Sequence, residues 1–308
     1  MYIKQTKIHA TGFPPQNNLK GPKTMMPAHI LRKTFHFFLA IILTAFVFTA
    51  CGGKDNANDA SVQISLPAEM TFSLPGNVKL ELVKVEAGSF TMSARDGENY
   101  DDEVSHRATL TKVFYIGRTE VTQAQWKAVM GTNPSNFKED DLPVEGVSWN
   151  EAMEFCEKLN DSGKAPSGWK FTLPTETQWE YAARGGRKSI GYKYSGSDNI
   201  DEVAWYEDNS GRKNHPVGQK KANELGLYDM SGNVSEWCLD DWNRNSSKLT
   251  AEFEFSRGND LDGSLHVFRG GSRSDDARLC RSASRSNYDV HGYHDYGLGF
   301  RLALVPVQ

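Results

Sequence analysis

The sequence lacks several features that would mark common classes of protein. Lysine and arginine are not gathered in one run, and the 308 residues carry a formal net charge of −4, which argues against a nucleic-acid-binding protein. No two histidines stand four positions apart, so the spacing of a helical metal-ligand pair is absent. We find no internal repeat, no low-complexity block and no sign of a domain boundary after residue 62. These absences predict one irregular α+β domain.

The C-terminal part is unusual for what it leaves out. Residues 273–296 include no lysine and no glutamate, and Asn, Asp, Tyr, His, Ser and Arg predominate. A solvated loop usually contains lysine and glutamate, whereas tyrosine with small polar residues is typical of recognition surfaces. Apolar and glycine-rich stretches at 267–272 and 297–303 bracket the segment. Composition leaves two interpretations open: a recognition surface, or an ordinary surface loop between two core strands.

The N-terminus predicts a targeting segment. Arg32 and Lys33 precede an apolar run over residues 35–50 that ends at Cys51, which is the order of parts in a secretory signal. The run is short and wrongly flanked for a membrane helix. Residues 48–51, Phe-Thr-Ala-Cys, resemble the bacterial lipobox, in which the cysteine is lipidated. An uncleaved signal anchor is the rival interpretation.

These features predict three parts. Residues 1–51 are an N-terminal extension and lipoprotein signal, in which Met25 or Met26 is a candidate start; residues 52–61 are a small, polar tether; and residues 62–308 are the folded domain. A lipid on Cys51 would bind the protein to a membrane outside the cytoplasm, at the outer membrane or cell surface.

Lipidation of Cys51 would leave an odd number of cysteines. We expect one disulfide, between Cys238 and Cys280, and a buried thiol at Cys156 on the apolar face of a helix.

The periodicity predicts short elements. Alternating residues at 78–85 predict a strand, and further strands follow a turn within 86–92 and at 108–116. Thr122 precedes a helical pattern, and Asn150 is the expected N-cap of a second helix. The buried stripe of this second helix is expected to be Ala152, Phe155, Cys156 and Leu159. A short capped helix within 171–184 is expected to stop at Gly185-Gly186, and the rest of the chain is mostly loop.

Six motifs resemble, in order, those of the formylglycine-generating (sulfatase-modifying factor) superfamily. The match runs from about residue 81 to 305. The motifs are Thr-Glu-Val-Thr-Gln-Ala-Gln-Trp at 119–126, Pro-Val-Glu-Gly-Val-Ser-Trp at 143–149, the stretch 173–186, the stretch 225–237, Phe-Arg-Gly-Gly-Ser at 268–272 and Gly-Phe-Arg-Leu at 299–302. The resemblance implies a single domain with the irregular, loop-rich C-type-lectin fold of the formylglycine-generating-enzyme type.

Fold alone does not imply the oxidase activity of that superfamily. The resemblance implies that the oxidase needs two cysteines five positions apart, after the Gly-Gly-Ser motif, to bind copper, and thiolates suit Cu(I). The corresponding positions here are Asp275 and Cys280, so no copper site is expected. The related iron-dependent sulfoxide synthases hold their histidines in an added helical domain, for which this chain has no room.

The C-terminal segment also resembles the variable region of diversity-generating retroelement proteins, which share this lectin-like fold. In those proteins template adenines are randomised, and an AAC codon altered at its first two letters never gives Lys, Glu, Gln, Met or Trp. None of these five residues occurs in residues 273–296. Arg273 departs from the pattern, because tryptophan is usual after Gly-Gly-Ser. A variable-region-like segment is therefore assigned to residues 268–303.

On this interpretation the segment presents an exposed face to an unknown protein or glycan ligand. Its predicted contact residues are Ser274, Asp275, Asp276, Leu279, Ser284, Ser286, Asn287, Tyr288, Asp289, His291, Tyr293, His294, Asp295 and Tyr296. Five others are predicted to be a supporting frame, with the arginines paired to buried carboxylates such as Glu176, Glu180 or Glu236. These frame residues are Arg278, Cys280, Arg281, Arg285 and Arg301.

The stretch from Asp229 to Glu236 matches the calcium motif of the superfamily. Two carboxylates, Asp229 and Glu236, with the backbone carbonyls of Gly232 and Val234 would suit a hard, oxygen-preferring ion. The alternative is that the two carboxylates are structural ion-pair partners.

The sequence thus predicts a lipid-anchored, non-catalytic ligand-binding protein. Two alternatives stay open: an enzyme of the same family with altered oxidative chemistry, and a structural surface lipoprotein of the gliding-machinery type.

Overall fold

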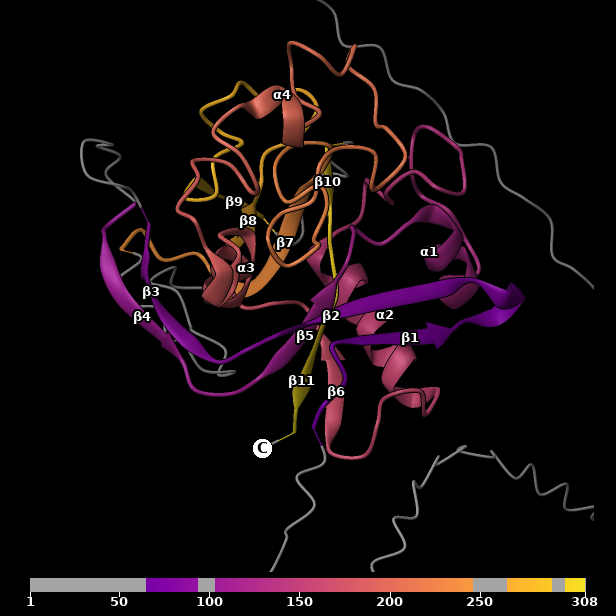
Figure 1. The fold of residues 1–308 in the computed structure, drawn as a ribbon. Coiled ribbons are helices and arrows are strands. Elements are labelled where there is room, and N and C mark those ends of the chain that lie inside the picture. The colour runs from indigo at the N-terminus through magenta and orange to yellow at the C-terminus, as the bar shows by residue number, and fades with distance from the viewer. Residues whose placement is uncertain (1–64, 94–102, 246–264, 290–296, 308) are drawn as a thin grey trace, which may run out of the picture. The chain divides into compact units, whose positions relative to one another are not determined.

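The largest sheet is built from both ends of the domain. The computed structural model describes residues 65–93, 103–245, 265–289 and 297–307, and residues 63–308 form one compact unit. Five antiparallel strands lie in the order β1-β2-β5-β11-β6 (Figure 1). Their bounds are β1 Glu69–Ser73, β2 Lys79–Val85, β5 Phe114–Gly117, β11 Ala303–Pro306 and β6 Trp169–Thr172. The last strand of the chain, β11, therefore lies between two earlier ones.

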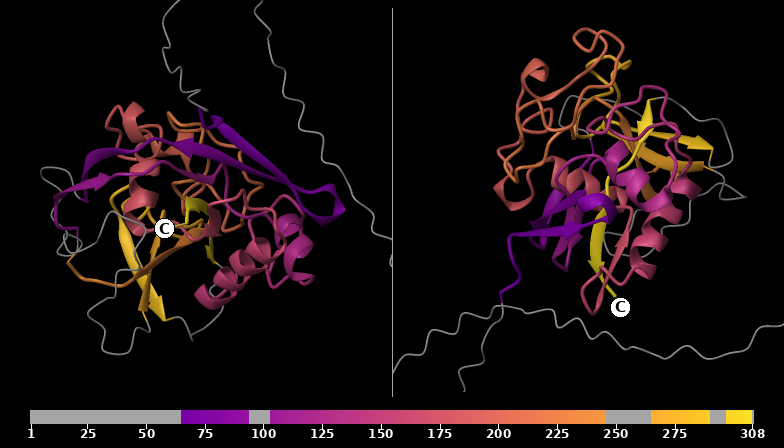
Figure 2. Two further views of the ribbon diagram at one scale, coloured as in Figure 1. Left: turned by 90° about the horizontal axis from the view of Figure 1, so that it is seen from below. Right: turned by 90° about the vertical axis from the view of Figure 1, so that its right-hand side faces the viewer.

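A second sheet carries the variable-region-like segment. Its order is β10-β7-β8-β9, with β10 parallel to β7 and the other pairs antiparallel. The bounds are β7 Ser235–Asp241, β8 Leu265–Arg269, β9 Arg285–Asp289 and β10 Leu298–Gly299. A separate ribbon pairs β3, Gly88–Met92, with β4, His106–Leu110. In the right-hand view of Figure 2, β8 and β9 lie on the side opposite the indigo strands near the N-terminus.

The helices are short and begin at well-formed caps. They are α1 Gln123–Met130, α2 Trp149–Asp161, α3 Glu176–Ala183 and the single turn α4 Ile200–Val203, with 3₁₀ turns η1 Pro75–Asn77 and η2 Gly186–Lys188. A capping box opens α1, α2 and α3, with N-caps Thr122, Ser148 and Thr175. The cap at Thr122 confirms the prediction.

Two local predictions were wrong. The N-cap of α2 is Ser148 and not Asn150, because the Ser148 hydroxyl accepts a hydrogen bond from the Glu151 N–H while the Glu151 carboxylate accepts one from the Ser148 N–H. Residues 108–116 do not form one strand. The chain leaves β4, which pairs with β3, and enters β5, which pairs with β2 and β11, so the alternating pattern spans two sheets.

Aromatic side chains fill the core. The predicted stripe of α2, Ala152, Phe155, Cys156 and Leu159, is buried as expected. Trp126 of α1 stacks on Phe155 with ring centroids 5.6 Å apart, which joins α1 to α2. A second buried cluster packs around Trp179 of α3. These two clusters hold the sheets against the helices.

The expected disulfide is not formed. Cys238 belongs to the buried cluster around Trp179, whereas Cys280 packs with Tyr194, Val203 and other residues of a third cluster. Both are free thiols, as is Cys156. The two cysteines pack in separate clusters, so the predicted disulfide was wrong. The number of cysteines in a sequence carries no information on the distance between them.

Within the described ranges, no helix has both the length and the apolar character that crossing a membrane requires.

Candidate ligand-binding site

The two faces of the β8–β9 hairpin have different surroundings. Phe268 stands opposite Ser286, and Arg269 stands opposite Arg285. Because side chains alternate along a strand, these two pairs point to opposite faces. The arginine face meets α3, and the Phe268 face meets Trp237, whose ring centroid lies 6.2 Å away. Both faces therefore contact the interior, but Arg269 and Arg285 are buried, whereas Phe268 and Ser286 are half-buried.

Buried ion pairs fasten the arginine face to α3. Arg285 donates two hydrogen bonds to the Glu176 carboxylate, at 2.7 and 2.6 Å, and Arg269 pairs with Glu180. Arg269 also donates to the carbonyl oxygens of Ser282, Ala283 and Ser284. The predicted pairing of a frame arginine with Glu176 is confirmed, whereas the partners of Glu180 are Arg269 and Arg184, which were not among the predicted frame residues. Arg269 also fixes the backbone that leads into β9.

Two further frame arginines are paired. Arg301 binds Glu236 through Nε and Nη2, both at 2.6 Å, as predicted. Arg281 is also buried, but its partner is Glu103, at 3.0 and 2.7 Å, from a distant part of the chain. No sequence signal indicated this contact. Arg278 was wrongly assigned to the frame: it is exposed and pairs with Asp276, two residues away.

The charges of this frame affect the ionisation of its carboxylates. Burial acts to raise the pKa of Glu180, but the guanidinium groups of Arg184 and Arg269 outweigh it and hold the pKa below its usual value. Breaking such a buried pair by removing one partner typically costs about 3–5 kcal/mol, because a charge is left without compensation. The buried ion pairs therefore hold the frame residues in place, whereas the side chains that line the nearby surface are not held by ion pairs of this kind.

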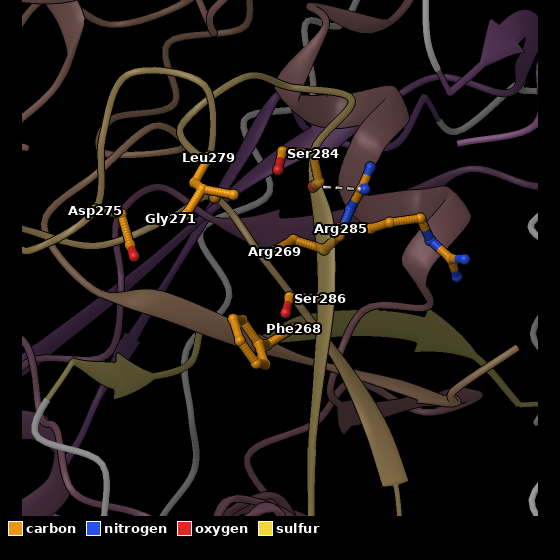
Figure 3. Close-up of a pocket in the computed structure, with 9 residues that line it drawn as sticks. Phe268, Arg269, Gly271, Asp275, Leu279, Ser284, Arg285 and Ser286 are labelled. Carbon is orange, nitrogen blue, oxygen red and sulfur yellow. Dashed lines mark hydrogen bonds between the residues drawn. The ribbon is translucent and has the colours of Figure 1, made fainter. Parts of the chain in front are cut away.

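A small pocket opens beside the β8–β9 hairpin. Its volume is about 80 Å³, and its lining includes Phe268, Asp275, Leu279 and Ser286, together with parts of Arg269 and Arg285. In Figure 3 these side chains surround one space, while the guanidinium of Arg285 points away from it. Leu279 is 46% exposed, so an apolar side chain stands at the rim. We call this space the apolar pocket.

A second space adjoins the first. It has a volume of about 200 Å³ and shares Phe268 and Asp275 with the apolar pocket. Its other lining includes Ser272, Arg273 and Ser274. We call this space the polar pocket. Phe268, which the motif analysis placed in the bracketing frame, is thus a wall of both pockets, and its outward position follows only from the register of β8 with β9.

The structure brings some of the predicted contact residues together. Asp275, Leu279, Ser284 and Ser286 line the apolar pocket, and Ser274 and Asp275 line the polar pocket. Ser284 is only 6% exposed, so it contributes to the pocket wall rather than to an open face.

Other predicted contact residues lie elsewhere. Asn287 stands opposite Val267, on the face that meets α3, and Tyr288 packs partly against the core cluster around Trp126. Asp289 is exposed at the end of β9, and Asp276 is held by Arg278. The predicted residues His291, Tyr293, His294, Asp295 and Tyr296, as well as Cys51, lie outside the described residues.

The two positions that correspond to the copper-binding cysteines of the oxidase are occupied by Asp275 and Cys280, so only one of them carries a thiol. Asp275 accepts hydrogen bonds from the Ser272 N–H and hydroxyl, at 2.8 and 2.7 Å, and so closes a local turn. Cys280 is fully buried, and burial raises the pKa of its thiol far above the usual value. Asp275 therefore shapes the loop, and Cys280 packs as a small apolar residue.

The residues of the calcium motif form a buried acidic cluster. Burial raises the pKa of Asp229 to about 6, and it raises the pKa of Glu120, which lies in the same cluster, well above its usual value. Within the described chain, Asp229 Oδ1 is buried with no hydrogen-bond partner, as a cation ligand would be.

Glu236, however, is already engaged. Its two oxygens accept hydrogen bonds from Arg301, and one also accepts from the indole N–H of Trp179 at 2.6 Å. A cation at Glu236 would meet the guanidinium. The set Asp229, Gly232, Val234 and Glu236 therefore does not fit a calcium ion as placed.

Comparisons with known proteins agree with this architecture. The chain is 41% identical over 228 residues to "Chaperone protein LppX" of Paenibacillus barcinonensis, covering 58% of this chain and 78% of that protein. It is 30% identical to the formylglycine-generating enzyme of Bos taurus, over 82% of each chain. The chain spans 55% of the formylglycine-generating enzyme of Thermomonospora curvata and 53% of that of Mus musculus.

A solved structure extends the comparison to the C-terminal segment. Treponema denticola variable protein 1 superimposes with a TM-score of 0.67 and 32% identity, over 78% of this chain and all of that one. The predicted single-domain fold and the likeness to variable proteins are thereby confirmed. The family model described as "Sulfatase-modifying factor enzyme 1-like domain" matches residues 71–305, and the chain belongs to this family.

Proposed function

We propose that the protein is a non-catalytic, lipid-anchored ligand-binding protein whose recognition site is the pair of pockets beside β8 and β9. The observation that carries this proposal is the lining of these pockets by Ser274, Asp275, Leu279 and Ser286, four of the predicted contact residues, over an ion-paired frame. Because the ion-paired frame fixes the backbone, the side chains that line the pockets can be replaced, and the ligand specificity can change, without loss of the fold.

The chemistry of the pockets supports binding rather than oxidation. They offer hydroxyls, one carboxylate, arginine side chains, an aromatic ring and leucines, which are groups that fix a ligand by shape and hydrogen bonds. The relative named as a chaperone favours a protein ligand over a glycan. The location that accompanies this function is extracytoplasmic, with the lipid at Cys51.

Diversification of the segment is tested by the DNA that flanks the gene. A near-copy of the codons for residues 268–303, differing only at template adenines and next to a reverse-transcriptase gene, is the expected result. Its absence would remove diversification and leave a binder with a fixed ligand.

Binding is tested by panning a random peptide library against the immobilised chain. Peptides that bind the chain are expected to lose binding to the double variant Phe268→Ser/Leu279→Ser, because both apolar surfaces of the pocket are removed. The matched control is Ile190→Ser, which alters an exposed apolar side chain elsewhere. Peptides that bind all three proteins alike would contradict the assignment of the site.

A further inference from the structure

A patch remote from the pockets combines exposed apolar side chains with positive charge. Ile190 is 67% exposed and Leu66 is 37% exposed. A pocket of about 250 Å³ has a lining that includes Lys84, Arg187 and Lys188. Lys188 precedes Ile190 by two positions in the chain, and Lys84 donates a hydrogen bond to the Leu66 carbonyl oxygen at 3.1 Å. We define these five residues as the basic–apolar patch. Among the large apolar side chains of the described residues, Ile190 has the greatest exposed fraction.

The chain around Ile190 carries charge of one sign. Residues 185–197 include Arg187, Lys188 and Lys193 and no acidic residue. Gly191, next to Ile190, has φ +83°, and no other part of the protein comes within 4 Å of the place that a Cβ would occupy there, so the loop tip stands clear of the domain. A projecting apolar tip flanked by basic residues suits the interface of an anionic bilayer.

Two acidic residues, Glu69 and Glu86, also line the pocket. Glu86 pairs with Lys84 at 2.9 Å, so the charge of Lys84 is compensated within the patch, and Glu69 pairs with Arg118, which also pairs with Glu81. Arg187 donates to the carbonyl oxygen of Ala87, a neutral partner that leaves its charge in place. Arg187 and Lys188 therefore supply the positive charge that a phosphate headgroup would meet.

The position of the patch agrees with a membrane partner. Leu66 is the second residue of the described chain, and Ala68 and Glu69 line the pocket with Arg187 and Lys188. Residues 52–61, the predicted tether, precede this point by only a few positions. If Cys51 is lipidated, as the proposed function holds, the short tether keeps this face near the bilayer.

We propose that the basic–apolar patch is a membrane-contact site for anionic phospholipid, with Ile190 entering the interface and Arg187 and Lys188 binding headgroup phosphates. A lipid anchor on a flexible tether fixes distance but not orientation. The patch supplies the second attachment, and it holds the domain with β8 and β9 on the side away from the lipid (Figure 2).

The test uses the full chain with Cys51→Ser and Ile190→Cys, labelled with the environment-sensitive fluorophore NBD, since Cys156, Cys238 and Cys280 are buried. Vesicles of phosphatidylcholine with phosphatidylglycerol are expected to raise the emission and shift it to shorter wavelength. Pure phosphatidylcholine vesicles are expected to have little effect. A label at Leu279→Cys, on the binding site, is the matched control and should not respond.

Two further arms decide the outcome. Arg187→Gln/Lys188→Gln should weaken the contact by about 30-fold, the effect of removing two basic residues from an anionic surface. Equal responses at positions 190 and 279, no response at 190, or an unaffected double variant would overturn the proposal. Soluble glycerol phosphate producing the same response would assign a free-phosphate site instead. None of these results bears on peptide binding at the pockets, so the two proposals fail separately.

Discussion

The two faces of the β8–β9 hairpin differ in how strongly their side chains are held. On the α3 side, Arg269 and Arg285 are fully buried and paired with Glu176 and Glu180. On the other side, Ser286 and Phe268 border pockets open to solvent. The difference teaches that the paired arginines are constrained by buried charge, whereas Phe268 and Ser286 carry no ion pair and are half-buried.

The strongest test of this comparison is to remove a buried partner. Arg285→Ala should lower the free energy of unfolding by about 3–5 kcal/mol, because Glu176 would stay buried without its cation. Urea unfolding followed by circular dichroism measures the change. A loss below about 1 kcal/mol, the scale of an ordinary surface substitution, would show that the pair is not a structural support.

The calcium motif offers a second test, on a neighbouring part of the frame. We expect no saturable heat when calcium is titrated into the protein, because Arg301 and Trp179 already engage Glu236. Isothermal titration calorimetry of the wild type and Glu236→Ala decides this. Saturable binding that Glu236→Ala abolishes would restore the four-residue calcium site.

The ionisation of Glu180 gives a pH-dependent test. Its pKa lies below the usual value in the folded protein, so the folded state binds fewer protons than the unfolded state in the acid range. Glu180 therefore contributes stability above its unfolded pKa of about 4.3, and this contribution is lost as the pH falls through the folded pKa.

Unfolding free energies of the wild type and Glu180→Gln should accordingly converge as the pH is lowered from 7 through the acid range. Glu207→Gln, which changes an exposed glutamate, is the matched control. If the unfolding free energies of Glu180→Gln and the wild type differ by the same amount at all pH values, the ion pairs of Glu180 do not depress its pKa.

The smallest effect is expected on the open face. Ser286→Tyr should change the free energy of unfolding by no more than about 0.5 kcal/mol, because the side chain borders a pocket and pairs with no charge. Thermal and urea unfolding measure it beside Arg285→Ala. A loss as large as that of Arg285→Ala would remove the distinction between the two faces.

Sequence predicted the frame better than the contact surface. Arginine is rarely buried without a partner, so Arg285 and Arg301 could be predicted to pair with buried carboxylates, among which Glu176 and Glu236 were named; which arginine meets which carboxylate came only from the structure. The same logic missed Glu103, the partner of Arg281, because 178 positions separate them. The pairing of Arg278 with its near neighbour Asp276 is a local, exposed contact that composition does not distinguish from a buried one.

The contact surface depends on register, which composition does not contain. Val267 and Phe268 are adjacent apolar residues, yet one is buried against α3 and the other forms a pocket wall. A shift of one residue would exchange their places. For the same reason Asn287 was grouped with Ser286, although their side chains leave the strand on opposite faces.

The place of β11 has a consequence for how the protein is made. This strand follows the recognition segment in the chain and pairs with both β5 and β6 in the interior of the main sheet. The main sheet is therefore incomplete until residues 303–306 have been synthesised. A chain that terminates before them, or loses its reading frame within residues 268–303, lacks the strand between β5 and β6 and exposes their edges. Such a chain cannot complete the main sheet.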